Sequence, residues 1–261
     1  MAPPRRKPVL ERGPVIGVPV TVGNLDSVAD EIMRAVRERR GGYVCVADAH
    51  MTTVARRDPE LAGIMARALI VSSDGMPLVW ELKRQGLAAE RVAGPDLMLY
   101  LRERAAAEDL PIFLYGGDPM IVQALIGALQ SRFAKLTFAG CEAPPRLPER
   151  PPFDADTAAR IESSGARIVF VGLGCPKQEY WIAAHAPRLS AVLIGVGAAF
   201  EYNAGLARRA PPWMRDRGLE WLYRLACNPR RLWKRYLTTI PLYLWYLALS
   251  RLSPDPPQDP R

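Results

Sequence analysis

Short runs of β-branched and aromatic residues alternate along the chain with longer segments in which apolar residues recur at helical spacing. The short runs are typical of strands buried on both faces, and the longer segments are typical of amphipathic helices. The predicted strands cover residues 43–47, 68–72, 111–115, 136–140, 167–171 and 191–196, after a short hairpin around 16–22. The predicted helices cover residues 24–39, 50–67, 77–84, 96–107, 119–133, 154–163 and 177–189.

This alternation predicts an α/β fold, a Rossmann-like parallel sheet with helices on both faces. Such sheets bind their ligands outside the carboxyl ends of the strands. Polar clusters follow four of the predicted strands: Asp48 with His50, Asp74 with Gly75, residues 116–118 and residues 172–179. We expect these clusters to converge on one crevice.

The last cluster is a polar corner in the segment IVFVGLGCPKQEYW, which begins at Ile168. Its glycines, Gly172 and Gly174, free the backbone for positive φ or close approach, and Pro176 suits the first turn of a following helix. The unpaired N–H groups of a helix N-terminus favour a phosphate or carboxylate. An ordinary turn with its polar side chains in water explains the same residues equally well.

Asp74 is the most interesting carboxylate of the sequence. It directly follows a predicted buried strand, so its side chain is expected at the strand's carboxyl end, where a general base is useful. The alternative is a helix N-cap, which Asp favours and which Pro77 nearby supports; the local residues alone favour this cap. Asp48 has the same ambiguity, whereas His50 is interpreted as a helix-start or surface residue.

A metal site and a nicotinamide site are both poorly supported. Asp154 and Asp156 form a DxD string, but no buried strand precedes them and they open a predicted helix, so capping explains them better. The glycine-rich segments GLGCPK and GVGAAF each lack the third glycine of a dinucleotide fingerprint. The four cysteines, which form no CxxC pair, indicate neither a metal site nor a disulfide framework; they are Cys45, Cys141, Cys175 and Cys227.

Length and composition allow one large domain with an appendage. The chain has 261 residues, 49% of them hydrophobic, and no stretch of eighteen or more uncharged apolar residues. Residues 1–12 are too rich in proline and charge for a signal peptide, so we expect the protein to stay in the cytoplasm. We predict disordered ends at 1–12 and 254–261, an α/β core at 13–207 and a helical appendage at 208–253.

Positive charge is concentrated near the C-terminus. The net charge is +8, and residues 205–237 contain nine basic residues against two acidic ones. In the same region arginines alternate with tryptophans and tyrosines, a pattern typical of a membrane interface. A helix pair packed on the main domain is an equally credible alternative. Nucleic-acid binding is a third, but no nucleic-acid motif accompanies the charge.

Six blocks, in order, carry a resemblance to a known family: DGMPLVW, ERVAGPDLM, FVGLGCPKQEYWIAAH, GVGAAFEYNAG, RRAPPWMRDRGLEWLYRL and NPRRLWKRY. From about residue 13 to 237 the chain resembles the WecG/TagA/CpsF family of bacterial glycosyltransferases, glycosyltransferase family 26. The resemblance implies transfer of a sugar from a nucleotide sugar, usually a UDP-sugar, to a saccharide on a polyprenyl diphosphate. This takes place at the cytoplasmic membrane face, in exopolysaccharide or cell-wall polymer assembly. The reaction is implied to be inverting and metal-independent, with no cofactor.

The resemblance also implies roles for particular residues. Asp74 matches the family's proposed catalytic base. Arg209, Arg224, Arg231 and Arg235 best match the family's C-terminal arginines and, with Gly172, Gly174 and Lys177, are expected to hold the leaving diphosphate. Gln178 is expected to contact the donor or the acceptor, and Arg91, Gly94 and Asp96 are expected to line the same crevice. The appendage is implied to close over the site while contacting an anionic membrane.

The chain departs from the family at the end of the predicted strand 43–47. Val46 and Asp48 stand where many relatives carry a Thr-x-Asn pair, which points to a different donor preference. Asp48 is interpreted as an acceptor to a sugar hydroxyl, with a competing role as base as the minor alternative. A homo-oligomer is compatible with the sequence. An oxidoreductase and a non-catalytic basic protein remain the alternative functions.

Overall fold

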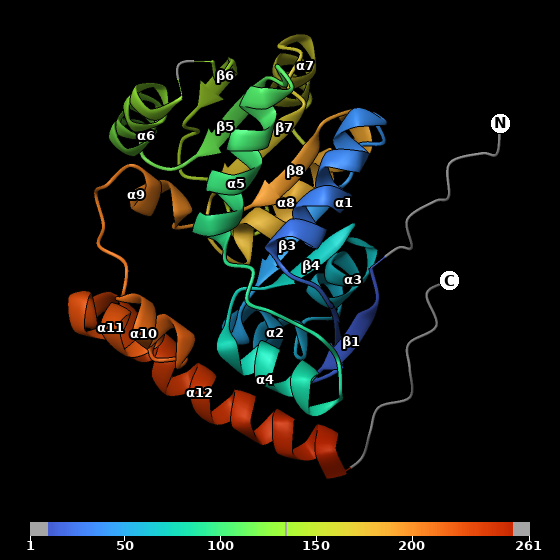
Figure 1. Ribbon diagram of the computed structural model, residues 1–261, viewed down its shortest axis with the longest axis vertical. Coiled ribbons are helices and arrows are strands. Elements are labelled where there is room, and N and C mark those ends of the chain that lie inside the picture. The colour runs from blue at the N-terminus through green and yellow to red at the C-terminus, as the bar shows by residue number, and fades with distance from the viewer. Residues whose placement is uncertain (1–9, 134, 253–261) are drawn as a thin grey trace, which may run out of the picture.

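The computed structural model describes residues 10–133 and 135–252 and contains an open six-stranded parallel sheet (Figure 1). The strand order is β4-β3-β8-β7-β5-β6, and every pair of neighbours is parallel. The strands are β3 (Tyr43–Ala47), β4 (Ile70–Ser73), β5 (Ile112–Gly116), β6 (Phe138–Glu142), β7 (Ile168–Gly172) and β8 (Val192–Gly195). The predicted Rossmann-like α/β fold is therefore confirmed, with strand ends that differ from the predicted ones by at most two residues.

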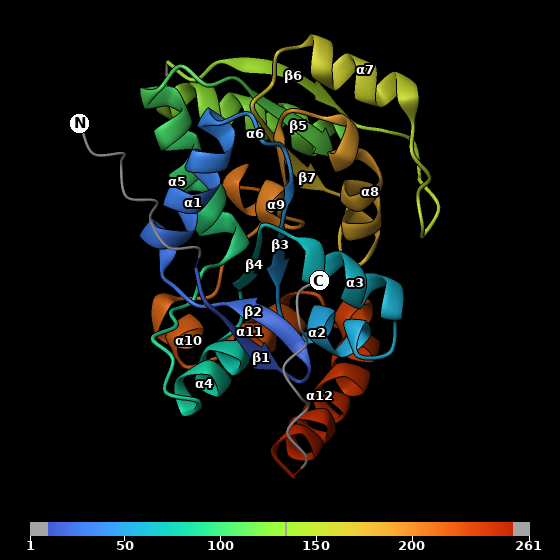
Figure 2. The ribbon, with the colours of Figure 1, turned by 90° about the vertical axis from the view of Figure 1, so that its right-hand side faces the viewer.

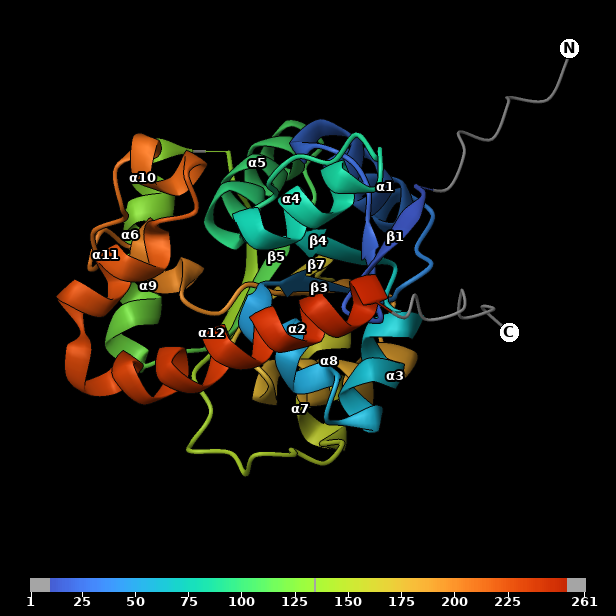
Figure 3. The same cartoon turned by 90° about the horizontal axis from the view of Figure 1, so that it is seen from below.

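Helices cover both faces of the sheet, as the doubly apolar strands require (Figures 2 and 3). One face carries α1 (Leu25–Arg37), α5 (Gly94–Ala107) and α6 (Pro119–Arg132). The other carries α2 (Ala49–Ala55), α3 (Pro59–Arg67), α7 (Ala155–Ser163) and α8 (Lys177–His185). Alternate residues of one strand enter the two cores: Val169 belongs to the core that contains residues of α8, whereas Phe170 belongs to the core that contains residues of α1 and α5.

A small antiparallel hairpin precedes the sheet. It consists of β1 (Arg12–Val15) and β2 (Val18–Thr21), so the prediction of a hairpin around 16–22 was shifted toward the C-terminus. Ile16 and Gly17, with φ of 45° and 83°, form its turn. β1 begins at Arg12, inside the N-terminal segment 1–12 that we predicted as disordered. Residues 1–9 of that segment and the whole of the predicted C-terminal segment 254–261 lie outside the described residues.

Two predicted helices were too long. The segment predicted at 50–67 is divided into α2 and α3 because Asp58 caps a new helix whose first residue is Pro59. The helix predicted at 177–189 ends at His185 and continues as a single 3₁₀ turn, η1 (Ala186–Arg188). The structure also contains α4 (Met76–Arg84) after β4, near its predicted position, and a short α9 (Ala199–Asn203) that we did not predict.

Three further helices follow, namely α10 (Pro212–Asp216), α11 (Glu220–Cys227) and α12 (Pro229–Leu252). Figure 3 shows α12 crossing below α2, near the carboxyl end of β3. Its buried side chains are Leu232, Tyr236, Thr239 and Tyr243, which share one helix face at spacings of three and four. Within the described ranges, no helix combines the length and the apolar character needed to cross a membrane.

Candidate active site

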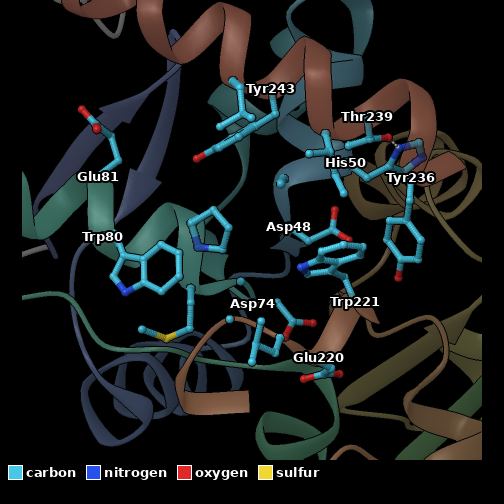
Figure 4. Close-up of a pocket in the computed structure, with 18 of the residues that line it drawn as sticks. Asp48, His50, Asp74, Trp80, Glu81, Glu220, Trp221, Tyr236, Thr239 and Tyr243 are labelled. Atoms are coloured by element: carbon cyan, nitrogen blue, oxygen red, sulfur yellow. Dashed lines mark hydrogen bonds between the residues drawn. The ribbon is translucent and has the colours of Figure 1, made fainter. Parts of the chain in front are cut away.

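A cavity of about 440 Å³ lies between the carboxyl ends of β3 and β4 and the three C-terminal helices (Figure 4). This volume is typical of a small-molecule site. The charged side chains at one end come from five different segments: Asp48, Asp74, Arg91, Glu220, Arg224 and Arg235. The other end, between α4 and α12, is an apolar arm lined by Met76, Pro77, Trp80, Tyr243, Leu244 and Leu247.

Asp74 lies directly after β4, and its backbone N–H donates to the carbonyl of Ala47, which extends the ladder between β4 and β3. Its Oδ1 accepts from Arg91 Nη2 at 3.3 Å, and its Oδ2 accepts from the backbone N–H of Gly94 at 3.4 Å. The N-cap of α4 is Gly75, which has no side chain to offer. The alternative interpretation of Asp74 as a helix cap is therefore wrong, and its carboxylate faces the cavity.

The environment of Asp74 makes it easier to protonate than an ordinary aspartate. Burial, assisted by the negative charges of Glu220 and Asp48, raises the pKa of Asp74 to about 7, although Arg91 opposes the shift. Its side chain nevertheless keeps 26% of its surface accessible from the cavity. A carboxylate with a pKa near neutrality and access to a ligand has the properties of a general base.

Asp48, by contrast, is occupied by structural contacts. It caps α2, with Oδ1 accepting from the backbone N–H of Met51 at 2.8 Å, as the cap interpretation predicts. Its Oδ2 accepts from Arg235 Nη2 at 3.3 Å. Burial raises its pKa, but the opposing charges of Arg235 and His50 and the Met51 N–H outweigh burial, so the pKa lies below its usual range. Asp48 is thus ionised and a weaker base than Asp74.

His50 connects the core to the last helix. It is the second residue of α2, in agreement with its prediction as a helix-start residue. Its Nδ1 lies 3.0 Å from Thr239 Oγ1 on α12, a contact drawn in Figure 4. Burial lowers the pKa of His50, so the imidazole is neutral near pH 7.

Arg91 joins Asp74 to α11. Its Nη2 contacts Glu220 Oε2 at 2.6 Å in addition to Asp74 Oδ1, and its Nε donates to the carbonyl of Asp74 at 3.2 Å. Figure 4 shows the carboxyl groups of Asp74 and Glu220 on the same side of the cavity. Arg91 is therefore shared between two acidic groups, one from the sheet edge and one from the C-terminal helices.

Asp96 and Arg209, both predicted to belong to the site, bind each other. Arg209 holds the carboxylate of Asp96 through two hydrogen bonds of 2.6 and 3.0 Å, and Arg215 lies 3.8 Å away. Arg215 lines the cavity, whereas Asp96 and Arg209 do not. This cluster attaches the segment before α10 to the first turn of α5.

The other predicted arginines divide into two groups. Arg224 and Arg235 line the cavity, and Arg224 lies over the ring of Tyr202 at 6.0 Å. The Nε of Arg235 is buried and makes no hydrogen bond within the described parts of the chain. Arg231 is exposed and does not line the cavity.

None of the predicted residues in the corner after β7 lines this cavity. Gly174 has φ of +82°, and a Cβ at Gly172 would lie 2.8 Å from the Phe200 ring, so both glycines are required as predicted. Pro176 is the N-cap residue of α8, one position ahead of the predicted first turn. Lys177 Nζ donates to the carbonyl of Leu147 at 2.7 Å, in the loop before α7.

Behind the corner lies a buried polar pair. Gln178 Oε1 accepts from the backbone N–H of Gly174 at 3.2 Å, and its Nε2 donates to Glu179 Oε1 at 2.8 Å. Burial raises the pKa of Glu179 to about 7, and the negative charge of Asp48 contributes. The corner follows β7 and Asp48 follows β3, and β8 lies between these two strands in the sheet.

Several residues of the cavity were not predicted from the sequence. Glu220 had a signal, since it is one of only two acids in the basic region 205–237. Glu81 is buried on α4 and accepts from Arg251 Nη2 of α12 at 2.8 Å, a pairing that no local pattern indicates. The aromatic lining was also missed, because Trp80, Trp221, Tyr236 and Tyr243 come from three separate helices.

The DxD string has a structural role. Asp154 caps α7 by accepting from the backbone N–H groups of Asp156 and Thr157, as predicted. Among the described residues, no group of three or more His, Cys, Asp or Glu side chains is arranged to hold a metal ion. The cysteines in these ranges are free.

An open parallel sheet with a titratable carboxylate and several arginines outside its carboxyl edge defines an α/β enzyme of the Rossmann-like class. The family model of the glycosyl transferase WecG/TagA/CpsF family matches residues 14–256. The chain belongs to this family. It is therefore a glycosyltransferase of polysaccharide biosynthesis, which acts on a nucleotide-sugar donor and an acceptor.

Proposed function

We propose that this enzyme transfers a sugar from a UDP-sugar to a saccharide linked to polyprenyl diphosphate, with inversion at the anomeric carbon and without a metal ion. The observation that carries the proposal is Asp74, whose pKa is raised to about 7 and which lies between the charged end of the cavity and its apolar arm. The negative charge of the donor diphosphate complements the arginines at the charged end. The apolar chain of the lipid-linked acceptor complements the apolar arm.

In the proposed reaction Asp74 acts as the general base. It takes the proton of the acceptor hydroxyl while that oxygen attacks the anomeric carbon, and the bond from this carbon to the diphosphate oxygen breaks on the opposite face. The proton remains on Asp74, and UDP leaves with the bonding electrons. A single displacement of this kind inverts the anomeric configuration.

The negative charge that develops on the leaving diphosphate requires positive groups aimed at it. Arg224 and Arg235 line the cavity, and the guanidinium group is well suited to phosphate oxygens. The corner of Gly172, Gly174 and Lys177, with Gln178 behind it, forms the wall of the donor site in our proposal. Asp48, held by Arg235, accepts a hydroxyl of the donor sugar.

The apolar arm and α12 support a lipid acceptor. The arm runs between α4 and α12, and Arg251 also lines the cavity. The first half of α12 exposes Arg230, Arg231 and Lys234 beside Trp233 and Leu237, and its second half exposes mainly apolar side chains, Leu244, Trp245, Leu249 and Leu252. Basic residues beside lipid phosphate and tryptophan at headgroup depth favour peripheral binding to the inner face of the cytoplasmic membrane.

A donor screen tests the proposal. The full chain is incubated with a polyprenyl-diphosphate saccharide and UDP-glucose, UDP-galactose, UDP-N-acetylmannosamine or a UDP-uronic acid, with and without EDTA. We expect one donor to give an inverted product, equally with and without chelator, and the Asp74→Asn variant to give none. Retention of configuration, or full activity of that variant, would contradict the mechanism. Titration with NAD(P) and flavins, expected to show no binding, tests the oxidoreductase alternative.

A further inference from the structure

Arg91 stands between the carboxylates of Asp74 and Glu220, and it binds Glu220 more closely. Its Nη2 is 2.6 Å from Glu220 Oε2 and 3.3 Å from Asp74 Oδ1. All three side chains are sheltered: Arg91 keeps 14%, Glu220 19% and Asp74 26% of its side-chain surface accessible. Because one nitrogen serves both carboxylates, a stronger contact with one weakens the stabilisation of the other.

The three groups come from parts of the chain that meet only in the folded protein. Asp74 follows β4, Arg91 precedes α5, and Glu220 is the first residue of α11. The contact between Arg91 and Glu220 spans 129 positions of sequence. The charge around the base therefore depends on where α11 lies.

The turn before Glu220 is seated on the core. Gly218 has φ of +69°, and a Cβ at this position would lie 2.6 Å from the Trp80 ring and 3.2 Å from Met76. Only glycine lets the turn between α10 and α11 approach α4 so closely. The packing of this turn on Trp80 thus sets the position at which Glu220 reaches Arg91.

We propose that Glu220 is a positioning residue, which binds the Arg91 guanidinium and so keeps Asp74 basic enough to accept the proton of the acceptor hydroxyl. This inference rests on the proposed role of Asp74 as the base. It assigns to α11 a part in the reaction besides covering the cavity. Asp74 is a competent base only while the turn before α11 is packed on α4 and Glu220 contacts Arg91.

The other charged groups around Asp74 also act on it. Asp48 at the end of β3 adds negative charge, and Arg209, from the segment before α10, lies close enough for mutual influence. Arg91 favours ionisation of Asp74, whereas Glu220 and Asp48 oppose it, which agrees with the raised pKa of Asp74. Removal of the Glu220 charge leaves Arg91 free to stabilise the ionised Asp74.

The test follows the titration of Asp74 by carbon-13 carboxyl NMR in the full chain without substrate. The Asp74→Asn and Glu179→Gln variants assign the two carboxyl signals that titrate near pH 7. We expect Glu220→Gln to move the Asp74 midpoint down by about one pH unit. Glu220→Asp keeps the charge and is expected to hold most of the wild-type midpoint. Asp216→Asn, the same change at the other acid of this region, is expected to leave it unmoved.

The acid limb of the kcat/KM profile is then expected to shift with the NMR midpoint in Glu220→Gln, with the donor KM changed by less than about twofold. An unchanged Asp74 midpoint in folded Glu220→Gln would overturn the inference, as would an equal shift in Asp216→Asn. If Glu220→Gln does not fold, a wild-type midpoint in Glu220→Asp supports the inference and a midpoint lowered by a full unit overturns it. Because the NMR arm needs no turnover, a wild-type enzyme without transferase activity would contradict the proposed function alone.

Discussion

Arg235 on α12 donates a hydrogen bond to Asp48 at the end of β3, across 3.3 Å of space and 187 positions of sequence. Two further contacts attach the same helix to the core, between Thr239 and His50 at 3.0 Å and between Arg251 and Glu81 at 2.8 Å. The cavity is therefore bounded by side chains that hold α12 in place. Substitutions at these contacts separate effects on the attachment of α12 from effects on the reaction itself.

The first prediction compares two aspartates at neighbouring strand ends. Asp74→Asn is expected to lower kcat by at least about 100-fold, because an amide cannot accept the proton. Asp48→Asn preserves the cap of α2, since Asn caps a helix as well as Asp, and is expected to change the donor KM more than kcat. Steady-state kinetics of both variants, with circular dichroism as the control for folding, measures this. A larger loss of kcat in Asp48→Asn would make Asp48 the base.

The second prediction concerns the buried carboxylate of Glu81. It accepts hydrogen bonds from Arg84, its neighbour on α4, and from Arg251 on α12. Glu81→Gln is expected to destabilise the fold by about 1–3 kcal/mol in urea titrations, because charged hydrogen bonds are lost in a buried place. It is also expected to increase hydrogen–deuterium exchange at residues 243–252. Arg84→Ala, which removes only the partner on α4, is the control, and equal exchange in both variants would contradict a specific role for Arg251.

The third prediction follows from the titration of Glu81. Hydrogen bonds from Arg84 and Arg251 outweigh burial and lower its pKa from 4.5 to about 2. The ionised Glu81 thus contributes its full stabilisation at pH values above 4.5, its pKa in the unfolded chain. This stabilisation is lost as the pH falls toward 2. Between pH 5 and pH 3 the wild type is expected to lose more free energy of unfolding than Glu81→Gln. If the free energies of unfolding of the two proteins change in parallel with pH, ionisation of Glu81 does not stabilise the fold.

The fourth prediction concerns the neutral range. The folded pKa of Glu179 is raised to about 7 from 4.5, chiefly by burial, so the folded state binds more protons than the unfolded state between these values. Stability from this group is present below pH 4.5 and is lost as the pH rises through 7. Thermal melts from pH 5 to 8 are expected to show a steeper fall in Tm for the wild type than for Glu179→Gln. The opposite order would show that Glu179 is ionised in the fold.

The fifth prediction concerns membrane binding by α12. Association with anionic liposomes is expected to weaken as salt rises, because exposed charges are screened within about 10 Å at ~0.1 M. Replacement of Arg230, Arg231 and Lys234 by glutamine is expected to reduce this salt-dependent part. Trp245→Ala is expected to weaken the part that persists at high salt. Sedimentation with neutral liposomes is the control, and binding independent of salt would point to insertion of the apolar half alone.

Local sequence was sufficient to locate the strands of the sheet along the chain. The run Ile168–Gly172 is apolar at every position that a doubly covered strand buries, so its assignment needs no tertiary information. The break between α2 and α3 was missed although Asp58 and Pro59 mark it, because helical periodicity continues across them. Of the four predicted polar clusters, those after β3 and β4 converge on one cavity, since parallel strands end at a common edge, whereas residues 116–118 and 172–179 do not line it.

The sequence by itself determined the α/β class, the family and the placement of Asp48 and Asp74 at strand ends, because these depend on periodicity and on residues near one another in the chain. Tertiary structure showed that both aspartates line the cavity and that only Asp48 also caps the helix that follows it. It also joined Arg91 to Glu220 and kept the predicted residues of the corner after β7 out of the cavity lining. Burial and charge pairing depend on segments more than a hundred residues apart, and no local pattern encodes them.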